Sequence, residues 1–212
     1  MKNKLFSIRT KTLELNQLRG FVKDAVGMYG HYGCTVAELG KLIGDTLITK
    51  PSYLDSLEIK ISDAENPNDI YKVIISSAFG LDEFTEMTVS RVDGLQKKMS
   101  VNDLNTLVND LLTNPDYKMP ENPFSEQLRE NIRSCEKQWG RRATVQQFLN
   151  QNTGTMFIGS GHLSINDGYY RTNVRYKHGM GYIEVSTAEG FKRKVTFNTL
   201  ASMFYKQEAK SQ

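Results

Sequence analysis

Cations and aromatic rings recur at alternate positions of two segments near the C-terminal end of the chain. Residues 169–177 alternate between a set rich in Arg, Lys and Tyr and a more apolar set, and residues 191–197 continue the pattern. Side chains of a β-strand point to opposite faces in turn, so we expect the cations to share one exposed face. Cations follow a phosphate backbone, while aromatic rings stack on unpaired bases. The residues predicted to bind nucleic acid are Tyr169, Arg171, Arg175, Lys177, Tyr182, Lys192 and Lys194.

The same alternation predicts which side chains face the interior. Tyr170 and Val174 fall on the opposite side of the first segment, and Val195 and Phe197 fall on the opposite side of the second. Arg193 shares the inward parity of Val195. The alternative interpretation of the cationic side is a solvated antiparallel face that carries charge for solubility.

Two histidines flank the basic segment and offer an enzymatic alternative. His162 and His178, with Arg171, Arg175 and Tyr170, are the residue types that a metal-independent ribonuclease uses as base, acid and phosphate clamp. Each histidine also adjoins a glycine turn, where any polar residue fits. Residue types without geometry are a weak signal. We therefore assign no catalytic residue and favour a non-enzymatic protein, with the ribonuclease as second alternative.

His31 and Cys34 lie three residues apart in a glycine-rich turn and have the spacing of half a metal site. Cys135 would have to complete the site with His162 or His178, because the sequence offers no second close pair of ligands. Structural zinc sites usually combine two such pairs. We therefore expect no metal and no cofactor, and two reduced cysteines in a reducing compartment.

Two further motifs are weaker. Residues 35–57 have the outline of a helix-turn-helix unit, but Pro51 falls early in its second helix and Lys50 is the single cation there, so an ordinary helical pair is preferred. The Gly159-Ser160-Gly161 turn lacks the Lys-Ser/Thr ending of a phosphate-binding loop.

Charge is divided unevenly along the chain. Residues 137–206 hold ten Lys and Arg against three acids, a net charge of +7, whereas residues 1–136 hold sixteen against twenty, a net charge of −4. Such asymmetry indicates a polyanionic partner. The main prediction is therefore a non-enzymatic nucleic-acid-binding or regulatory accessory protein, its partner being single-stranded or duplex nucleic acid. The first alternative is a protein–protein module, an assembly factor or an inhibitor of a host enzyme, that meets a protein partner through its acidic half or exposed tyrosines.

Hydropathy and composition are those of a soluble protein. No run approaches the ~18 apolar residues of a membrane span, and the N-terminus lacks the apolar core of a signal peptide. We expect a cytoplasmic protein without a membrane partner. The Asn- and Lys-rich composition is interpreted as that of a viral or phage accessory protein, which would place it in the host cytoplasm.

Periodicity predicts an α+β fold. Residues 1–112 are predicted to form a mainly helical, slightly acidic part, with helices near 16–26, 35–43, 66–79 and 100–111 and one strand at 57–61. Residues 113–123, which contain three prolines, are predicted to be a linker. Residues 124–212 are predicted to form a basic α+β part. It would hold two helices, a small antiparallel β-meander or barrel, and a C-terminal helix that closes it.

Overall fold

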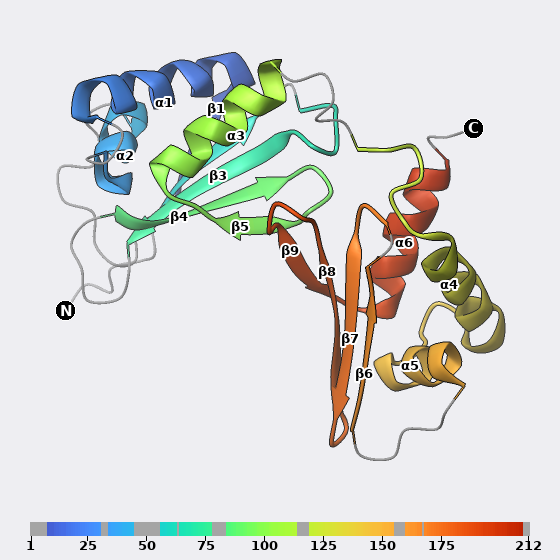
Figure 1. The fold of residues 1–212 in the computed structure, drawn as a ribbon. Helices are drawn as coiled ribbons and strands as arrows, with labels where there is room; N and C mark the ends of the chain where they lie inside the picture. The colour runs from blue at the N-terminus through green and yellow to red at the C-terminus, as the bar shows by residue number, and fades with distance from the viewer. Residues whose placement is uncertain are drawn as a thin grey trace. The chain divides into compact units, whose positions relative to one another are not determined.

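The computed structural model describes residues 8–30, 34–44, 56–62, 64–77, 84–113, 119–154, 160–166 and 168–209. Within these ranges the chain forms six helices and nine strands, which makes the fold α+β (Figure 1). The chain divides into two compact units, Met1–Lys118 (unit 1) and Met119–Gln212 (unit 2). The division falls inside the proline-rich segment 113–123.

Unit 1 contains a five-stranded sheet and three helices. In chain order these are β1 (Ile8–Leu13), α1 (Leu15–Tyr29), α2 (Val36–Gly44), β2 (Ser56–Ile61), β3 (Ile70–Ser77), β4 (Phe84–Arg91), β5 (Gln96–Lys98) and α3 (Val101–Thr113). The strand order follows the chain, with β1 parallel to β2 and every later neighbour antiparallel. Helices α1 and α3 lie side by side over one face of this sheet (Figure 1).

The N-terminal part is therefore not mainly helical, and the helix predicted over residues 66–79 is wrong. That segment forms β3 and the turn before it, where the backbone N–H of Asn68 donates to the side-chain oxygen of Asn66 over 3.0 Å. Ile70, Val73 and Ile75 are buried. β-Branched side chains are stiff at χ1 and favour a pleated strand. The helix was predicted because the periodicity of a short, nearly continuous apolar run does not distinguish a strand from a helix.

Several helix starts in unit 1 are as predicted because their caps are local. The Thr35 hydroxyl accepts from the backbone N–H of Glu38, and the Glu38 carboxylate accepts from the backbone N–H of Thr35 over 2.7 Å. Ser100 and Asp103 form the same reciprocal cap at α3. Each such cap satisfies two helix-end donors that otherwise lack a partner.

Unit 2 consists of three helices packed on one face of a four-stranded antiparallel sheet. Its elements are α4 (Glu126–Trp139), α5 (Val145–Thr153), β6 (Ser160–Ile165), β7 (Arg171–Lys177), β8 (Met180–Ser186), β9 (Lys192–Val195) and α6 (Phe197–Glu208). Each strand pairs with the next along the chain, so the predicted meander is confirmed. The sheet does not close, because β6 and β9 are not neighbours, and the predicted barrel is not supported. Residues 155–158, whose apolar side chains also predict a short strand, lie outside the described residues.

Aromatic side chains fill the space between the helices and the sheet of unit 2. The rings of Phe148 on α5 and Phe197 on α6 lie 5.3 Å apart, and that of Phe124 lies 4.9 Å from Tyr170. Aromatic pairs of this geometry add to the free energy gained by burial. Leu128, Ile132 and Cys135 of α4 are buried, whereas Trp139 at its C-terminal end remains 46% exposed. None of the described helices is both long enough and apolar enough to cross a membrane.

Candidate nucleic-acid interface

The strand register of unit 2 brings the predicted cations onto one face of the sheet. Directly paired residues of an antiparallel sheet point to the same side. Arg175 on β7 pairs with Tyr182 on β8, and Lys194 on β9 pairs with Glu184 on β8. We call the outward side chains of β7, β8 and β9 that carry a positive charge or an aromatic ring the basic face. Its members are Arg171, Arg175, Lys177, Tyr182, Lys192 and Lys194.

Burial confirms the predicted orientation of these strands. Arg171, Arg175 and Lys177 are exposed, whereas Thr172 and Val174 between them are buried. The alternation arises because the inward set packs under α5, which contacts β6, β7 and β8.

The second cationic strand behaves in the same way. Lys192 and Lys194 are exposed, and Val195 and Phe197 are buried as predicted. Arg193 shares the inward parity but is exposed, so its side chain is solvated from the other side of the strand. It is not counted in the basic face.

The five cations of the basic face have no carboxylate partner in the part of the chain that the structure describes. On the strands of unit 1, by contrast, the outward cations contact carboxylates. Lys60 and Lys72 both contact Glu58, and Lys98 contacts Glu86 over 2.9 Å. A solubilising surface needs mixed charge, which the unit 1 sheet has. Uncompensated charge of one sign instead produces an attractive field for an anion.

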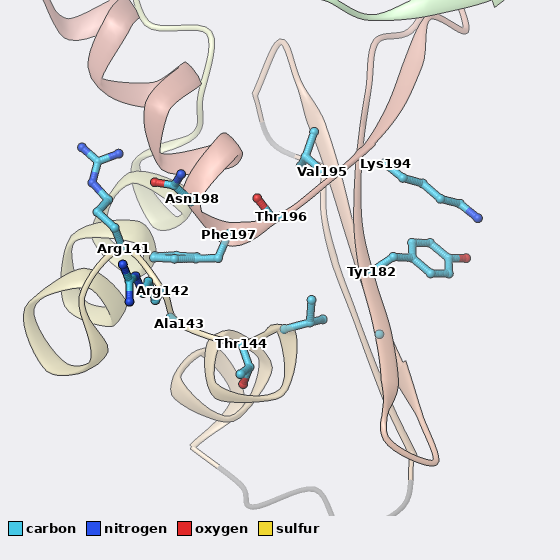
Figure 2. A pocket seen from close by; sticks show the side chains of 12 residues that line it. Arg141, Arg142, Ala143, Thr144, Tyr182, Lys194, Val195, Thr196, Phe197 and Asn198 are labelled. Carbon is cyan, nitrogen blue, oxygen red and sulfur yellow. The ribbon is translucent and has the colours of Figure 1, made fainter.

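Tyr182 lies between cations on both neighbouring strands. Arg175 is its direct partner on β7, and the ammonium of Lys194 on β9 lies 4.2 Å from the centre of its ring. Figure 2 shows the Tyr182 and Lys194 side chains together on the side of the strands away from the helices. A cation over an aromatic face is a favourable contact of the order of 1 kcal/mol. The basic face thus presents the aromatic ring of Tyr182 in contact with Lys194 and next to Arg175.

Tyr169 is placed differently from the other predicted residues. It precedes the first residue of β7, so the strand register does not assign it to the basic face. Its ring packs edge-on against the buried Tyr170, with the two centroids 5.1 Å apart.

β6 also contributes to the outward side of the sheet, which the sequence did not predict. His162 pairs with Arg175 and Ser160 pairs with Lys177, so both extend the outward side of the sheet next to β7. In the structure, positions 160–165 alternate between exposed and less exposed. The corresponding signal in the sequence is weak, because Leu163 and Ile165 are the two large apolar residues of this strand. His178 instead occupies the β7–β8 turn in a left-handed conformation, with φ of 47°.

The two histidines do not converge on one point of the sheet. His162 is level with Arg175, and His178 follows three residues further along, which is about 10 Å at the rise of a β-strand. No contact favours a shared phosphate between them, and the ribonuclease interpretation stays a prediction.

A hollow of about 660 Å³ lies where α5 and α6 begin, and its lining includes Tyr182 and Lys194 of the basic face (Figure 2). Arg141 and Arg142 line it. Arg141 is already engaged, because it pairs with Glu136 and its guanidinium lies 4.5 Å from the ring centre of Tyr205. Arg142 and Lys194 are the lining cations that form no ion pair with a carboxylate among the described residues. Lys194 already belongs to the basic face, so we rank the hollow below the basic face.

The cysteines show no sign of reactive or metal-binding chemistry. Burial, and to a lesser extent Glu136, raises the pKa of the Cys135 thiol to about 12. Partial burial, with Glu38, also raises the pKa of Cys34. A thiolate is the metal ligand and the nucleophile, so both shifts oppose such roles. His31, the predicted companion of Cys34, lies outside the described residues, and the described residues contain no cluster of three ligand-type side chains.

Comparisons of the chain with models of known families, with curated proteins and with solved structures find no match, so the site must be interpreted from its own geometry.

Proposed function

We propose that the protein binds nucleic acid through the basic face, as a non-enzymatic accessory or regulatory protein. The observation that carries this proposal is the contrast between cations on the strands of unit 1 and cations on the strands of unit 2. Cations on the unit 1 sheet are paired with carboxylates, whereas those on the basic face have no such partner among the described residues. A polyanion supplies the missing negative charge.

The geometry of the strands suits a ligand with regularly repeated charge. Arg175 and Lys177 are two residues apart on β7, about 7 Å at the rise of a strand, and Lys192 and Lys194 repeat that spacing on β9. Binding of phosphates to these cations releases condensed counterions, which is the main source of affinity for nucleic acid. Glu184 is the one carboxylate of the outward positions of β7, β8 and β9, and its register partner is Lys194.

The test is a salt series on the wild-type protein with a fluorescently labelled oligonucleotide. The logarithm of the affinity should fall linearly with the logarithm of the salt concentration, by about 0.7 for each phosphate contacted on a single strand. Co-purified nucleic acid, seen in the absorbance ratio and removed by a high-salt wash, would agree with the proposal. Absence of binding even at low salt would reject it.

A protein–protein function is the second candidate, and one observation favours it. A surface hollow of about 520 Å³ on α4 and α5 is lined by the half-exposed Trp139 and by amide side chains, without a charged residue in the lining. Interface cores are depleted in charge and enriched in Trp. Replacing Trp139 with Ala should abolish capture of such a partner with little sensitivity to salt, and it should leave nucleic-acid binding unchanged.

A further inference from the structure

We infer that the ligand of the basic face is single-stranded nucleic acid and that one unpaired base stacks on Tyr182. The inference rests on the proposed function and adds to it the strand state of the ligand and the residue that detects it. It follows from the environment of Tyr182, the width of the sheet and the position of Lys194.

Tyr182 is the aromatic ring of the basic face and has a cation on each side. Arg175 pairs with it across β7–β8, and Lys194 approaches its ring from β9 to within 4.2 Å of the centroid. The ring belongs to an outward position of β8, whose inward neighbour Ile183 is fully buried under the helices. A base on this ring would have its flanking phosphates within reach of cations on both adjacent strands. Stacking surfaces combined with such cations are typical of proteins that bind single strands.

A duplex cannot use this arrangement. The four strands of unit 2 span about 14 Å between the outermost backbones, and the major groove of B-DNA is about 12 Å wide. A helix or a two-stranded ribbon enters that groove, whereas this sheet stays outside it and contacts phosphates alone. In a duplex the faces of the bases are covered by the neighbouring base pairs. The Tyr182 ring could therefore stack on a base only after that base had been unstacked, which costs free energy.

Lys194 occupies the place that a base would take. In the free protein its ammonium lies over the Tyr182 ring and forms a cation–π contact with it. An incoming base replaces the ammonium on the ring, and the ammonium turns to a neighbouring phosphate. Lys194 therefore covers the Tyr182 ring in the absence of ligand and adds a charge contact in its presence.

The test compares three variants and three probes. The variants are Tyr182→Leu, Tyr182→Phe and Lys194→Ala, each checked for a wild-type thermal transition. The probes are an oligothymidine of about 12 nucleotides, within the usual site size for single strands, a duplex of equal length, and inorganic polyphosphate. Polyphosphate reports the charge of the face without any base.

We expect wild-type protein to prefer the oligothymidine over the duplex. Tyr182→Leu should weaken oligothymidine binding roughly 5- to 150-fold, the range measured for loss of one stacked base, while polyphosphate affinity stays within about twofold. Tyr182→Phe should retain oligothymidine binding because its ring remains. Lys194→Ala should weaken both oligothymidine and polyphosphate because a charge is lost.

The outcomes separate the inference from the proposed function. Equal affinity for single strand and duplex, together with an unchanged Tyr182→Leu variant, would overturn the inference and leave the proposed function intact. Equal loss of polyphosphate and oligothymidine binding in Tyr182→Leu would also overturn it, because the effect would then be general. A wild-type protein that binds neither nucleic acid would overturn both.

Discussion

Cations on the two sheets of this chain differ in what they contact, and this difference is visible residue by residue. Lys98 contacts Glu86, and Lys60 and Lys72 share Glu58, so each of these cations has a carboxylate partner. Exposed pairs of this kind contribute at most about 1 kcal/mol to stability. Arg171 and Arg175 have no such partner among the described residues. Under the proposed function, these two side chains serve binding rather than folding.

The two sides of the unit 2 sheet should respond oppositely to truncation. Phe197→Ala removes a ring that is 1% exposed and packs against Phe148, so we expect a loss of roughly 3–5 kcal/mol. Arg175→Ala alters an exposed side chain and should change stability by about 0.5 kcal/mol or less. Urea denaturation of both variants measures the difference. A large loss in Arg175→Ala would mean that this side chain has a structural role.

Cys135 should make stability fall at alkaline pH. Its pKa is raised to about 12 in the folded protein from an ordinary value of 9.0, mainly by burial. The buried neutral thiol therefore contributes fully below pH 9.0, and the contribution is lost as pH rises from there towards 12. The slope from one thiol is at most about 1.4 kcal/mol per pH unit. Cys135→Ala should flatten the stability profile between pH 9 and 11, and an unchanged slope would show that other groups cause it.

At the level of elements, the sequence predicted features that depend on neighbouring residues. It did not predict features that depend on pairing with residues far away in the chain. The helices predicted near 35–43 and 100–111 are confirmed, because the caps at Thr35 and Ser100 involve residues only three apart. The alternation of β7 is equally local and placed Arg171 and Arg175 correctly. β3 was mistaken for a helix because its identity depends on pairing with β2 and β4. The unpaired state of the cations and the Tyr182–Lys194 contact also depend on register, so periodicity alone did not provide them.

The approach of segment 123–125 to the 168–170 turn supports the start of β7 and allows a matched pair of glycine variants. A Cβ at Gly168 would lie 2.6 Å from the backbone nitrogen of Ser125, so Gly168→Ala should destabilise by roughly 1–3 kcal/mol. Gly20→Ala, on the exposed side of α1 with no atom near its Cβ, should stabilise by up to about 1 kcal/mol. Thermal unfolding of the two variants tests whether the first loses stability and the second gains it. A harmless Gly168→Ala would contradict the close approach.

At the level of the whole molecule, the candidate interface belongs to one unit. All members of the basic face lie in Met119–Gln212, and the paired cations that serve as an internal comparison lie in Met1–Lys118. The segment 113–123 should be the first site of limited proteolysis, because its three prolines and polar composition oppose regular structure. Mass spectrometry of early fragments measures this. First cleavage inside 70–77 or 171–177 would contradict the prediction.

The salt dependence of two double variants tests the central claim most directly. Arg171→Ala/Arg175→Ala removes two unpaired cations of the basic face, and Lys60→Ala/Lys98→Ala removes the same charge from paired positions on the unit 1 sheet. With a labelled single-stranded oligonucleotide, the arginine variant should bind more weakly. Its salt slope should be flatter by about 1.4, or about 0.7 for each lost phosphate contact. The lysine variant should keep the wild-type slope. Equal slopes in wild type and both variants, or equal losses in both variants, would contradict the assignment of binding to the basic face.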